Sequence, residues 1–120
     1  MNPVLVQQNV KAFHAHLYYQ DEQGVEMAKA VAEQAAVLFD IRVGRFHQQA
    51  VGPHPVWSCQ LSFKAEHLGD IVTWLMLNRR TLDVFLHPVT GDDYLDHTQG
   101  CAWLGRSYTL DLSQFTLSNQ

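Results

Sequence analysis

Five of the seven histidines in this 120-residue chain lie in segments that one folded domain can bring together. Histidine is the side chain best suited to binding transition metals and to transferring protons near neutral pH. Two of the five alternate along one segment, and the other three come from separate parts of the chain. The sequence therefore predicts that one metal-centred site collects them. The five candidates are His14, His16, His54, His87 and His97.

The elements that would position these histidines follow from the spacing of apolar residues. Apolar and polar residues alternate where strands are expected, and apolar residues recur at helical spacing where helices are expected. Asp21 is a suitable N-cap for the first helix. The expected strands cover about residues 12–19, 41–50, 56–63 and 82–87, with a weaker one around 107–112, and the expected helices cover about 23–39 and 65–78.

The order of these elements is βαββαβ, which predicts an α+β protein with a ferredoxin-like fold. The antiparallel sheet would have the strand order 4-1-3-2, with both helices on one face. We expect the tail from about Asp92 to Gly105 to fold over the opposite, open face. A chain of this length is expected to form a single domain, 1–120, with its core at about 12–105.

The two-residue period of a strand places His14, His16 and His87 on the open face of the sheet. The first and fourth strands would be antiparallel neighbours, so these three side chains can converge on one ion. Histidines two apart on a strand are separated by about 6–7 Å at the backbone. His54 shares this face but is expected further from the ion, and His97 would enter from a loop. The alternative is a polar face whose histidines are hydrogen-bonded to neighbours or water.

Three further residues are candidates for substrate binding. Tyr18 and Trp103 could line an aromatic pocket, although most such residues are packing residues. Arg79, next to Arg80, could bind a substrate carboxylate with its planar guanidinium. A cationic helix C-terminus is an equal alternative. Asp92, Asp93 and Asp96 could supply a carboxylate ligand, but acidic loops are usually solvated or turn-forming. His47 and His67 are interpreted as solvated surface residues.

Composition excludes several classes of function. The formal net charge is −4, with eight lysines and arginines and no basic run, so a nucleic-acid surface is not expected. No apolar run approaches the roughly 20 residues of a membrane span. The start of the chain lacks the pattern of a secretory signal, and Cys59 and Cys101 are expected to form no disulfide, so we expect a cytoplasmic protein. Apolar residues on the open face, Phe85 and Val56, predict a homodimer.

Several segments of the chain resemble the DOPA 4,5-dioxygenase family, which contains small ring-cleaving enzymes of fungi and bacteria. The resemblance covers about residues 12–105, and its segments are specific in combination. One departure is Arg80, where glycine is expected after Asn78 and Arg79. The matching segments are FHAHLYY (13–19), GPHP (52–55), LDVFLHPVTG (82–91), DHT (96–98) and WLG (103–105).

The resemblance implies extradiol cleavage of a catechol, such as L-DOPA or a caffeate-like acid, by non-haem Fe(II) and O₂. The metal ligands would be His14, His16 and His87, although Zn²⁺ would suit three histidines equally well in the purified protein. His54 and His97 would be the general acid and base, in an order that stays open. The alternatives are a ferredoxin-like metal- or ligand-binding domain without turnover, a cofactor-free monooxygenase and a structural domain.

Overall fold

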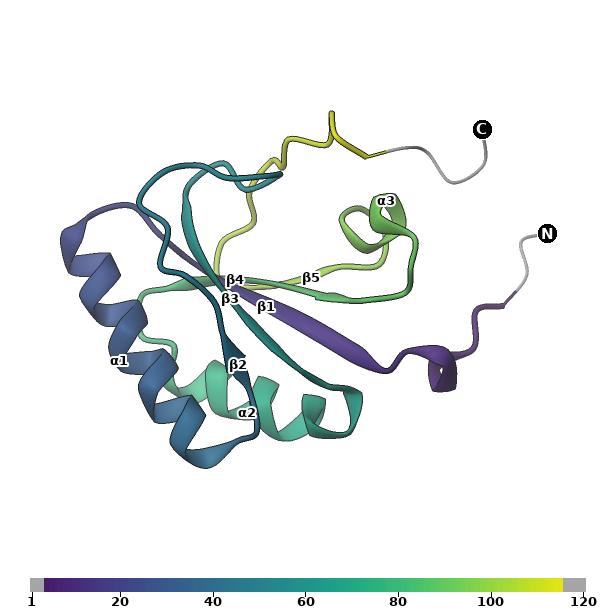
Figure 1. Ribbon diagram of the computed structural model, residues 1–120, viewed down its shortest axis with the longest axis horizontal. Coiled ribbons are helices and arrows are strands. Elements are labelled where there is room, and N and C mark those ends of the chain that lie inside the picture. The colour runs from purple at the N-terminus through teal and green to yellow at the C-terminus, as the bar shows by residue number, and fades with distance from the viewer. Residues whose placement is uncertain (1–3, 116–120) are drawn as a thin grey trace.

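The computed structural model describes residues 4–115 and contains a five-stranded antiparallel sheet with the order β2-β3-β1-β4-β5. Helices α1 and α2 cover one face, and α3 lies on the other (Figure 1). The α+β class and the predicted order 4-1-3-2 are confirmed, with β5 added beside β4. The elements are η1 (Gln7–Asn9), β1 (Ala12–Tyr19), α1 (Glu22–Leu38), β2 (Arg42–Val43), β3 (Trp57–Lys64), η2 (Ala65–His67), α2 (Leu68–Asn78), β4 (Asp83–Pro88), α3 (Asp93–Asp96) and β5 (Ala102–Leu104).

The core lies between the sheet and the two long helices. Ala15 and Leu17 of β1 and Leu61 of β3 are fully buried against Val31 of α1 and Leu75 of α2. Burying one leucine side chain contributes about 1.5–3 kcal/mol. Because the odd-numbered positions of β1 are held in this core, the even-numbered ones must point to the other face. The core therefore fixes where the histidines of β1 point.

The first helix begins where the sequence predicts. The Asp21 side chain accepts a hydrogen bond of 2.7 Å from the Gly24 backbone N–H, which is the geometry of an N-cap. A Cβ atom on Gly24 would lie 2.6 Å from the Cβ of Tyr19, so this position has no room for a side chain. The close approach fixes the angle at which the chain leaves β1.

The turn between α2 and β4 retains the conformation that glycine favours, although arginine occupies it. Arg80 has a φ of 59°, in the left-handed region. Arg79 holds the same turn, because its guanidinium donates to the carbonyls of Leu82 (3.1 Å) and Met76 (3.3 Å). The guanidinium predicted to bind a substrate carboxylate is therefore used to fix this turn.

An Arg80→Gly substitution should stabilise the protein. The left-handed conformation costs a non-glycine residue about 1–2 kcal/mol, and glycine removes that cost but gives the unfolded chain more freedom. We expect the free energy of unfolding to rise by about 0.5–1 kcal/mol in urea titrations. An Arg80→Ala substitution, which keeps the strain, should give no such rise. An equal gain from alanine would show that the backbone conformation is not the cause.

The second strand is shorter than predicted. It covers Arg42–Val43, whereas the sequence predicts a strand from 41 to 50. The N–H of Gly44 donates to the carbonyl of Gln60 (2.8 Å), and the N–H of His47 donates to that of Ser58 (3.0 Å). Between these two hydrogen bonds the chain advances three residues, from Gly44 to His47, while β3 advances two, from Gln60 to Ser58. The extra residue forms a bulge that interrupts the strand pairing.

The weak prediction of a strand at 107–112 is wrong. The free edge of β4 is paired with β5 instead, so no ladder position is left for the later segment. The polar groups of this segment bond to other parts of the chain: the Tyr108 hydroxyl donates to Asp83 (2.6 Å), and the Asp111 N–H donates to the Pro53 carbonyl (2.9 Å). Residues 105–115 therefore run as an irregular strap.

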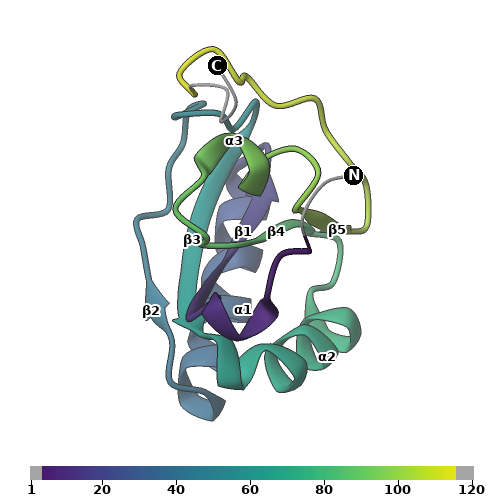
Figure 2. The same cartoon turned by 90° about the vertical axis from the view of Figure 1, so that its right-hand side faces the viewer.

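The open face is covered by the chain itself, as predicted for the tail. Figure 2 shows the strands from β2 at the left to β5 at the right, with α3 in front of the sheet. Phe85 is fully buried, packed against Trp103 of β5 with ring centroids 4.7 Å apart. Phe85 is therefore not an exposed residue that a partner subunit would cover, and the homodimer stays a prediction.

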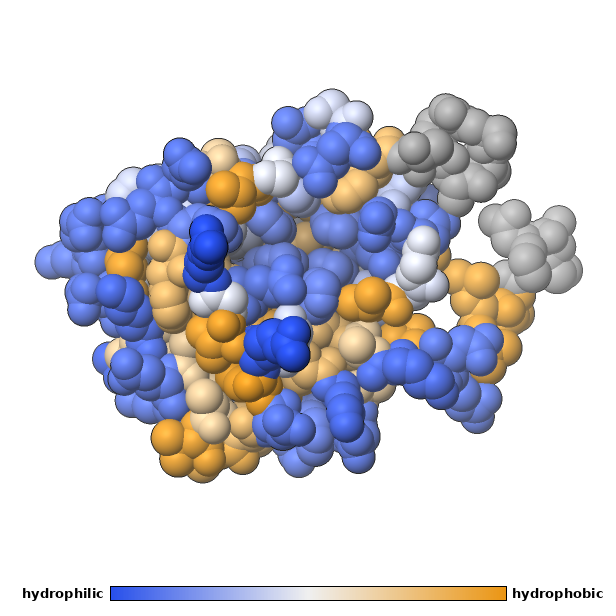
Figure 3. All heavy atoms as spheres, viewed as in Figure 1, coloured by the Kyte–Doolittle hydropathy of each residue, from blue (hydrophilic) through white to orange (hydrophobic). Residues whose placement is uncertain are grey.

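The exposed apolar side chains lie elsewhere. They belong mainly to the N-terminal segment, with Leu5 69% exposed, and to the ends of α1 and α2, with Val37 86% and Leu77 80% exposed. Figure 3 shows apolar residues mainly in the lower half of its view. Within residues 4–115 no helix is long and apolar enough to cross a membrane.

Candidate metal centre

Three histidines from two neighbouring strands meet on the open face. His14 and His16 come from β1, and His87 comes from β4, where it pairs with His14 in the register. One ring nitrogen of each lies within 4.8 Å of the others. The Nε2 atoms of His16 and His87 are 3.1 Å apart. The predicted convergence is therefore present, while the role of the three as ligands stays a prediction.

The spacing of this trio suits one transition metal. A histidine nitrogen binds such an ion at about 2.1 Å, so two ligands of one ion are at most about 4.2 Å apart. The His16–His87 pair falls well inside this limit. All three nitrogens lie within 4.8 Å of one another, so small side-chain movements would bring the full trio within this limit. The donor set is three imidazoles, which suits Zn²⁺ or Fe(II).

The tautomer of His87 leaves the lone pair on Nε2, the nitrogen that faces His16. Its Nδ1 lies 2.8 Å from the carbonyl oxygen of Pro88, which can only accept, so Nδ1 must be the donor. A neutral imidazole carries one proton, and the lone pair is then on Nε2, the atom that faces His16. Such a carbonyl contact is the usual means of orienting a metal-binding histidine.

Burial keeps these imidazoles neutral. It lowers the pKa of His87 to about 4, against a smaller opposing effect of the Pro88 carbonyl. Burial also lowers the pKa of His16 well below its ordinary value, helped by the neighbouring His54 and His87. The half-buried His14 has a pKa shifted in the same direction, again mainly by burial. Neutral imidazole is the form that binds metal, so little proton displacement is needed near pH 7.

The lowered pKa values predict how the stability of the metal-free protein depends on pH. The unfolded histidines have a pKa of about 6.5 and the folded His54 and His87 of about 4, so the unfolded state binds more protons between these values. Stability should therefore be lost as the pH falls from about 6.5 to about 4. Between about pH 7.5 and about pH 5 each of the two histidines should lose about 2 kcal/mol of stabilisation, so we expect the free energy of unfolding in urea titrations to fall by about 4 kcal/mol. A His87→Gln variant should show a flatter dependence. A midpoint that does not change over this range would contradict the neutral, buried state of the cluster.

His54 lies closer to the trio than the sequence predicts. Its ring centroid is 4.2 Å from that of His16, although it was expected further from the ion. The turn before it causes the difference: Gly52 has a φ of 55°, and the His54 N–H donates to the Val51 carbonyl (3.0 Å). This tight turn folds His54 back onto the middle of β1.

Tyr18 contacts His54 through its hydroxyl group. The Tyr18 oxygen lies 2.6 Å from Nδ1 of His54, and both side chains are buried. Burial raises the pKa of the Tyr18 phenol, followed by smaller effects of Tyr108 and Cys101, so the phenol keeps its proton. Burial likewise lowers the pKa of His54 to about 4. The phenol is the better donor and the imidazole the better acceptor, so the proton lies on the Tyr18 oxygen and Nε2 of His54 keeps the imidazole proton.

His97 reaches the same site from the loop after α3. Its Nδ1 donates to the carbonyl of Asp93 (2.7 Å), which leaves the lone pair on Nε2. The ring packs between His87 and Phe115, with centroid distances of 4.5 Å and 4.4 Å. His97 is thus held in one orientation beside the trio.

Asp96 is a buried residue of the site that sequence reasoning missed. It is 1% exposed and accepts hydrogen bonds from the Thr90 hydroxyl (2.6 Å) and the Thr90 N–H (3.0 Å). Both carboxylate oxygens therefore hold the loop from β4 to α3, and with it His97. The sequence indicates a solvated acidic loop around Asp96, because Asp92 and Asp93 precede this residue. The signal in the sequence was Thr90, which lies six residues before Asp96 and directly before a glycine and could serve as its hydrogen-bond partner.

Of the predicted substrate-binding residues, only Tyr18 contacts this cluster. Trp103 lies behind Phe85, with ring centroids 4.7 Å apart, and does not line the histidine pocket. Arg79 fixes the turn after α2, as described above. Neither location supports the predicted contact with substrate, because Trp103 packs against a neighbouring strand and Arg79 fixes the turn at the end of α2.

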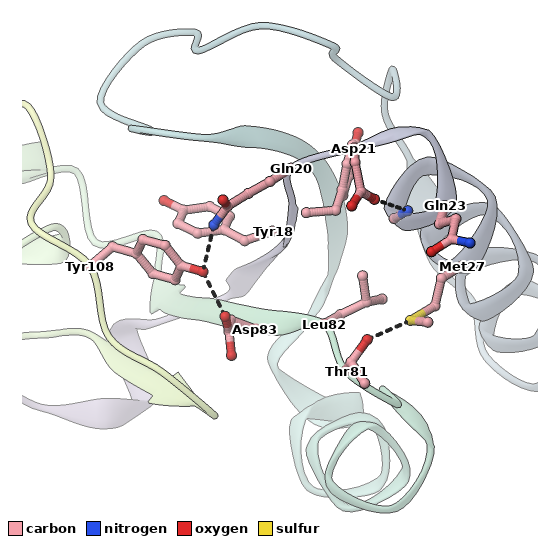
Figure 4. Close-up of a pocket in the computed structure, with 11 residues that line it drawn as sticks. Tyr18, Gln20, Asp21, Gln23, Met27, Thr81, Leu82, Asp83 and Tyr108 are labelled. Carbon is pink, nitrogen blue, oxygen red and sulfur yellow. Dashed lines mark hydrogen bonds between the residues drawn. The ribbon is translucent and has the colours of Figure 1, made fainter.

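The trio opens onto a cavity of about 240 Å³, which His54, His97, Gln60 and the strap residues Gln114 and Phe115 also line. A second pocket of about 220 Å³ lies at the far end of β1 (Figure 4). There the Asp83 carboxylate accepts from Tyr108, whose oxygen accepts from Gln20 (3.4 Å). No histidine lines that pocket, so the first cavity is the candidate functional site.

The fold and the site define an α+β protein with a buried histidine cluster suited to one metal ion. The model of the Dopa 4,5-dioxygenase family matches residues 13–114. The chain belongs to this family, and the resemblance seen in its sequence motifs is confirmed.

Individual relatives agree with this assignment. The chain is 27% identical over 118 residues to a DOPA 4,5-dioxygenase of Amanita muscaria, covering 92% of this chain and 52% of the relative. It is 33% identical over 113 residues to an uncharacterized 21.2 kDa protein of Botryotinia fuckeliana, covering 85% of this chain and 62% of the relative. The chain thus spans about half to three fifths of the length of these curated relatives.

A solved structure matches almost end to end. The crystal structure of a proposed dioxygenase from Nostoc punctiforme is 34% identical, with a TM-score of 0.85 over 89% of this chain and 92% of that one. The similarity in fold therefore extends over most of both chains.

Proposed function

We propose that this protein is an extradiol dioxygenase that cleaves the ring of a catechol such as L-DOPA, using Fe(II) and O₂. The observation that carries the proposal is the trio of neutral imidazoles on β1 and β4, two of them buried and one half-buried, in a chain of the Dopa 4,5-dioxygenase family. A structural role would not require three uncharged imidazoles with their nitrogens facing one another.

The metal would be held by His14, His16 and His87. Bound Fe(II) supplies the redox chemistry that joins a catechol to O₂ and opens the ring beside the diol. The two oxygens of Asp96 are occupied by Thr90, so the trio is the donor set that the described residues offer. Zn²⁺ suits the same ligands, and we expect purified protein to carry it where iron is scarce.

The two remaining histidines would move protons. His97 has its lone pair on Nε2, because Nδ1 donates to Asp93, so it is suited to accept a proton from the catechol. His54 keeps a proton on Nε2, because Tyr18 donates to its Nδ1, so it is suited to donate as the ring opens. We therefore assign His97 as the base, His54 as the acid and Tyr18 as the residue that fixes the tautomer of His54.

The cavity fits a small, single-ring substrate. Its volume of about 240 Å³ lies below the roughly 300–1,000 Å³ typical of sites for drug-sized ligands. The walls combine aromatic rings with imidazole and amide groups, which suits a planar diol. A catechol with a short side chain is the substrate class proposed here.

The test is oxygen uptake by protein loaded anaerobically with Fe(II) and then mixed with L-DOPA or caffeate in air. We expect O₂ consumption equal to the catechol consumed, with the visible absorbance of a ring-opened product. A His16→Ala variant should show neither. Turnover that survives a strong chelator would favour a cofactor-free monooxygenase, and bound metal without turnover of any catechol would favour a binding domain.

We also propose a cytoplasmic homodimer. The buried Cys59 and the partly exposed Cys101 are both free, as is typical of a reducing compartment. Exposed apolar residues such as Leu5 and Val37 offer surface for self-association. Light scattering should give twice the mass of one chain.

A further inference from the structure

The charges at the histidine pocket are all acidic within the part of the chain that the structure describes. Asp93 and Asp96 line the cavity, and no lysine or arginine does so. The buried Asp96 is fully used by Thr90, as described above. Asp93 is exposed, and its carboxylate has no hydrogen bond or ion pair within residues 4–115, although its carbonyl accepts from His97. One free carboxylate therefore stands beside the proposed base.

Two arginines near the ends of the sheet, Arg79 and Arg106, contact other groups of the protein and not the cavity. Arg79 binds backbone carbonyls, and Arg106 lies over the ring of Tyr108, 5.1 Å from its centroid. The amides of Gln60 and Gln114, which also line the cavity, are uncharged. A carboxylate on a bound molecule would thus meet no guanidinium, the group that usually binds it in proteins.

On this basis we infer that the pocket selects catechols whose side chain carries a protonated amine over catechols whose side chain carries only a carboxylate. Asp93 is the specificity-determining residue. The inference rests on the proposed function and narrows its substrate class to catechols with an amine, which include L-DOPA, in preference to caffeate-like acids. An ammonium group would gain the attraction of Asp93, whereas a carboxylate would be repelled by it and find no partner.

The expected size of the effect follows from the exposure of Asp93. A solvent-exposed charge pair contributes about 0.2–1 kcal/mol. Attraction of the amine and repulsion of the acid act together, so the affinities should differ by about 2- to 30-fold. Salt should reduce this ratio, because the contact is exposed.

The test uses three catechols with short side chains of different charge: dopamine, 4-ethylcatechol and 3-(3,4-dihydroxyphenyl)propionate, which are cationic, neutral and anionic. Dissociation constants are measured with the Fe(II)-loaded protein under nitrogen, and kcat/KM is measured in air. We expect dopamine to bind most tightly and the propionate most weakly. Asp93→Asn should reduce the ratio between them to within about twofold, and Asp93→Lys should reverse it. Asp70→Asn, an exposed change on α2, should leave the ratio unchanged.

The outcomes separate this inference from the proposed function. If the neutral catechol is cleaved but the propionate binds as tightly as dopamine, the charge selection is wrong and the dioxygenase stands. If Asp93→Asn and Asp93→Lys leave the ratio unchanged, Asp93 is not the specificity-determining residue, and the inference is wrong while the dioxygenase stands. If none of the three catechols binds or is cleaved, the dioxygenase proposal fails, and the inference fails with it.

Discussion

A His87→Gln protein should fold normally but lose its tightly bound metal and, with it, catechol cleavage. His87 provides one of three converging imidazoles, and its Nε2 is 3.1 Å from that of His16. Loss of a residue that merely supports a ligand costs about 10- to 100-fold in metal affinity, so loss of a ligand should cost at least about 100-fold. Metal content by mass spectrometry and O₂ uptake measure the two effects.

Thermal unfolding gives a second readout that does not depend on activity. Metal that binds only the folded state stabilises the wild type by about 2.7 kcal/mol at a concentration 100 times the dissociation constant. The His87→Gln variant should gain almost nothing from added Zn²⁺. His67→Gln, on the helix-covered side of the sheet, is the matched control and should behave as wild type. Full metal content in the His87→Gln protein would remove this histidine from the ligand set.

A His54→Gln protein should keep its metal but lose most of its turnover. His54 lies against His16, yet it is outside the trio and is bonded to the Tyr18 hydroxyl at 2.6 Å. Loss of a general acid reduces kcat by about 10²- to 10⁴-fold. The expected result is an unchanged ratio of metal to protein with a strongly reduced kcat. Tyr18→Phe should give a smaller loss in kcat and a changed pH profile, because it removes only the group that fixes the tautomer.

The His87→Gln and His54→Gln variants together distinguish metal ligands from acid–base groups, a distinction that the sequence left open. If His54→Gln loses the metal as His87→Gln does, then His54 is a ligand and the assignment must be redrawn. If Tyr18→Phe leaves both kcat and its pH profile unchanged, the hydroxyl has no role in proton transfer and is a packing contact.

The parts of the structure that follow from local periodicity could be predicted. Alternation along β1 and β4 placed His14, His16 and His87 on one face, and the βαββαβ order made the two strands neighbours. These predictions depend only on the two-residue period of a strand and on which side the helices cover.

The parts that depend on contacts between distant segments could not be predicted. The distance of His54 from the trio is set by a turn with positive φ at Gly52, which periodicity does not describe. Asp96 looks solvated in the sequence, because its partner Thr90 becomes a neighbour only when the loop closes. Arg79 could equally have been a substrate ligand or a helix-end residue, and only the folded turn distinguishes the two.

The measurement that tests the central claim most directly is cleavage of L-DOPA under ¹⁸O₂ by the Fe(II)-loaded protein. The aldehyde product is reduced at once with borohydride to prevent exchange with water, and mass spectrometry then counts the label. The proposed chemistry predicts that both atoms of one O₂ molecule enter the ring-opened product, and that the His16→Ala protein forms none. A single labelled oxygen, or a labelled product that forms equally well in the His16→Ala protein, would contradict ring cleavage at the histidine centre.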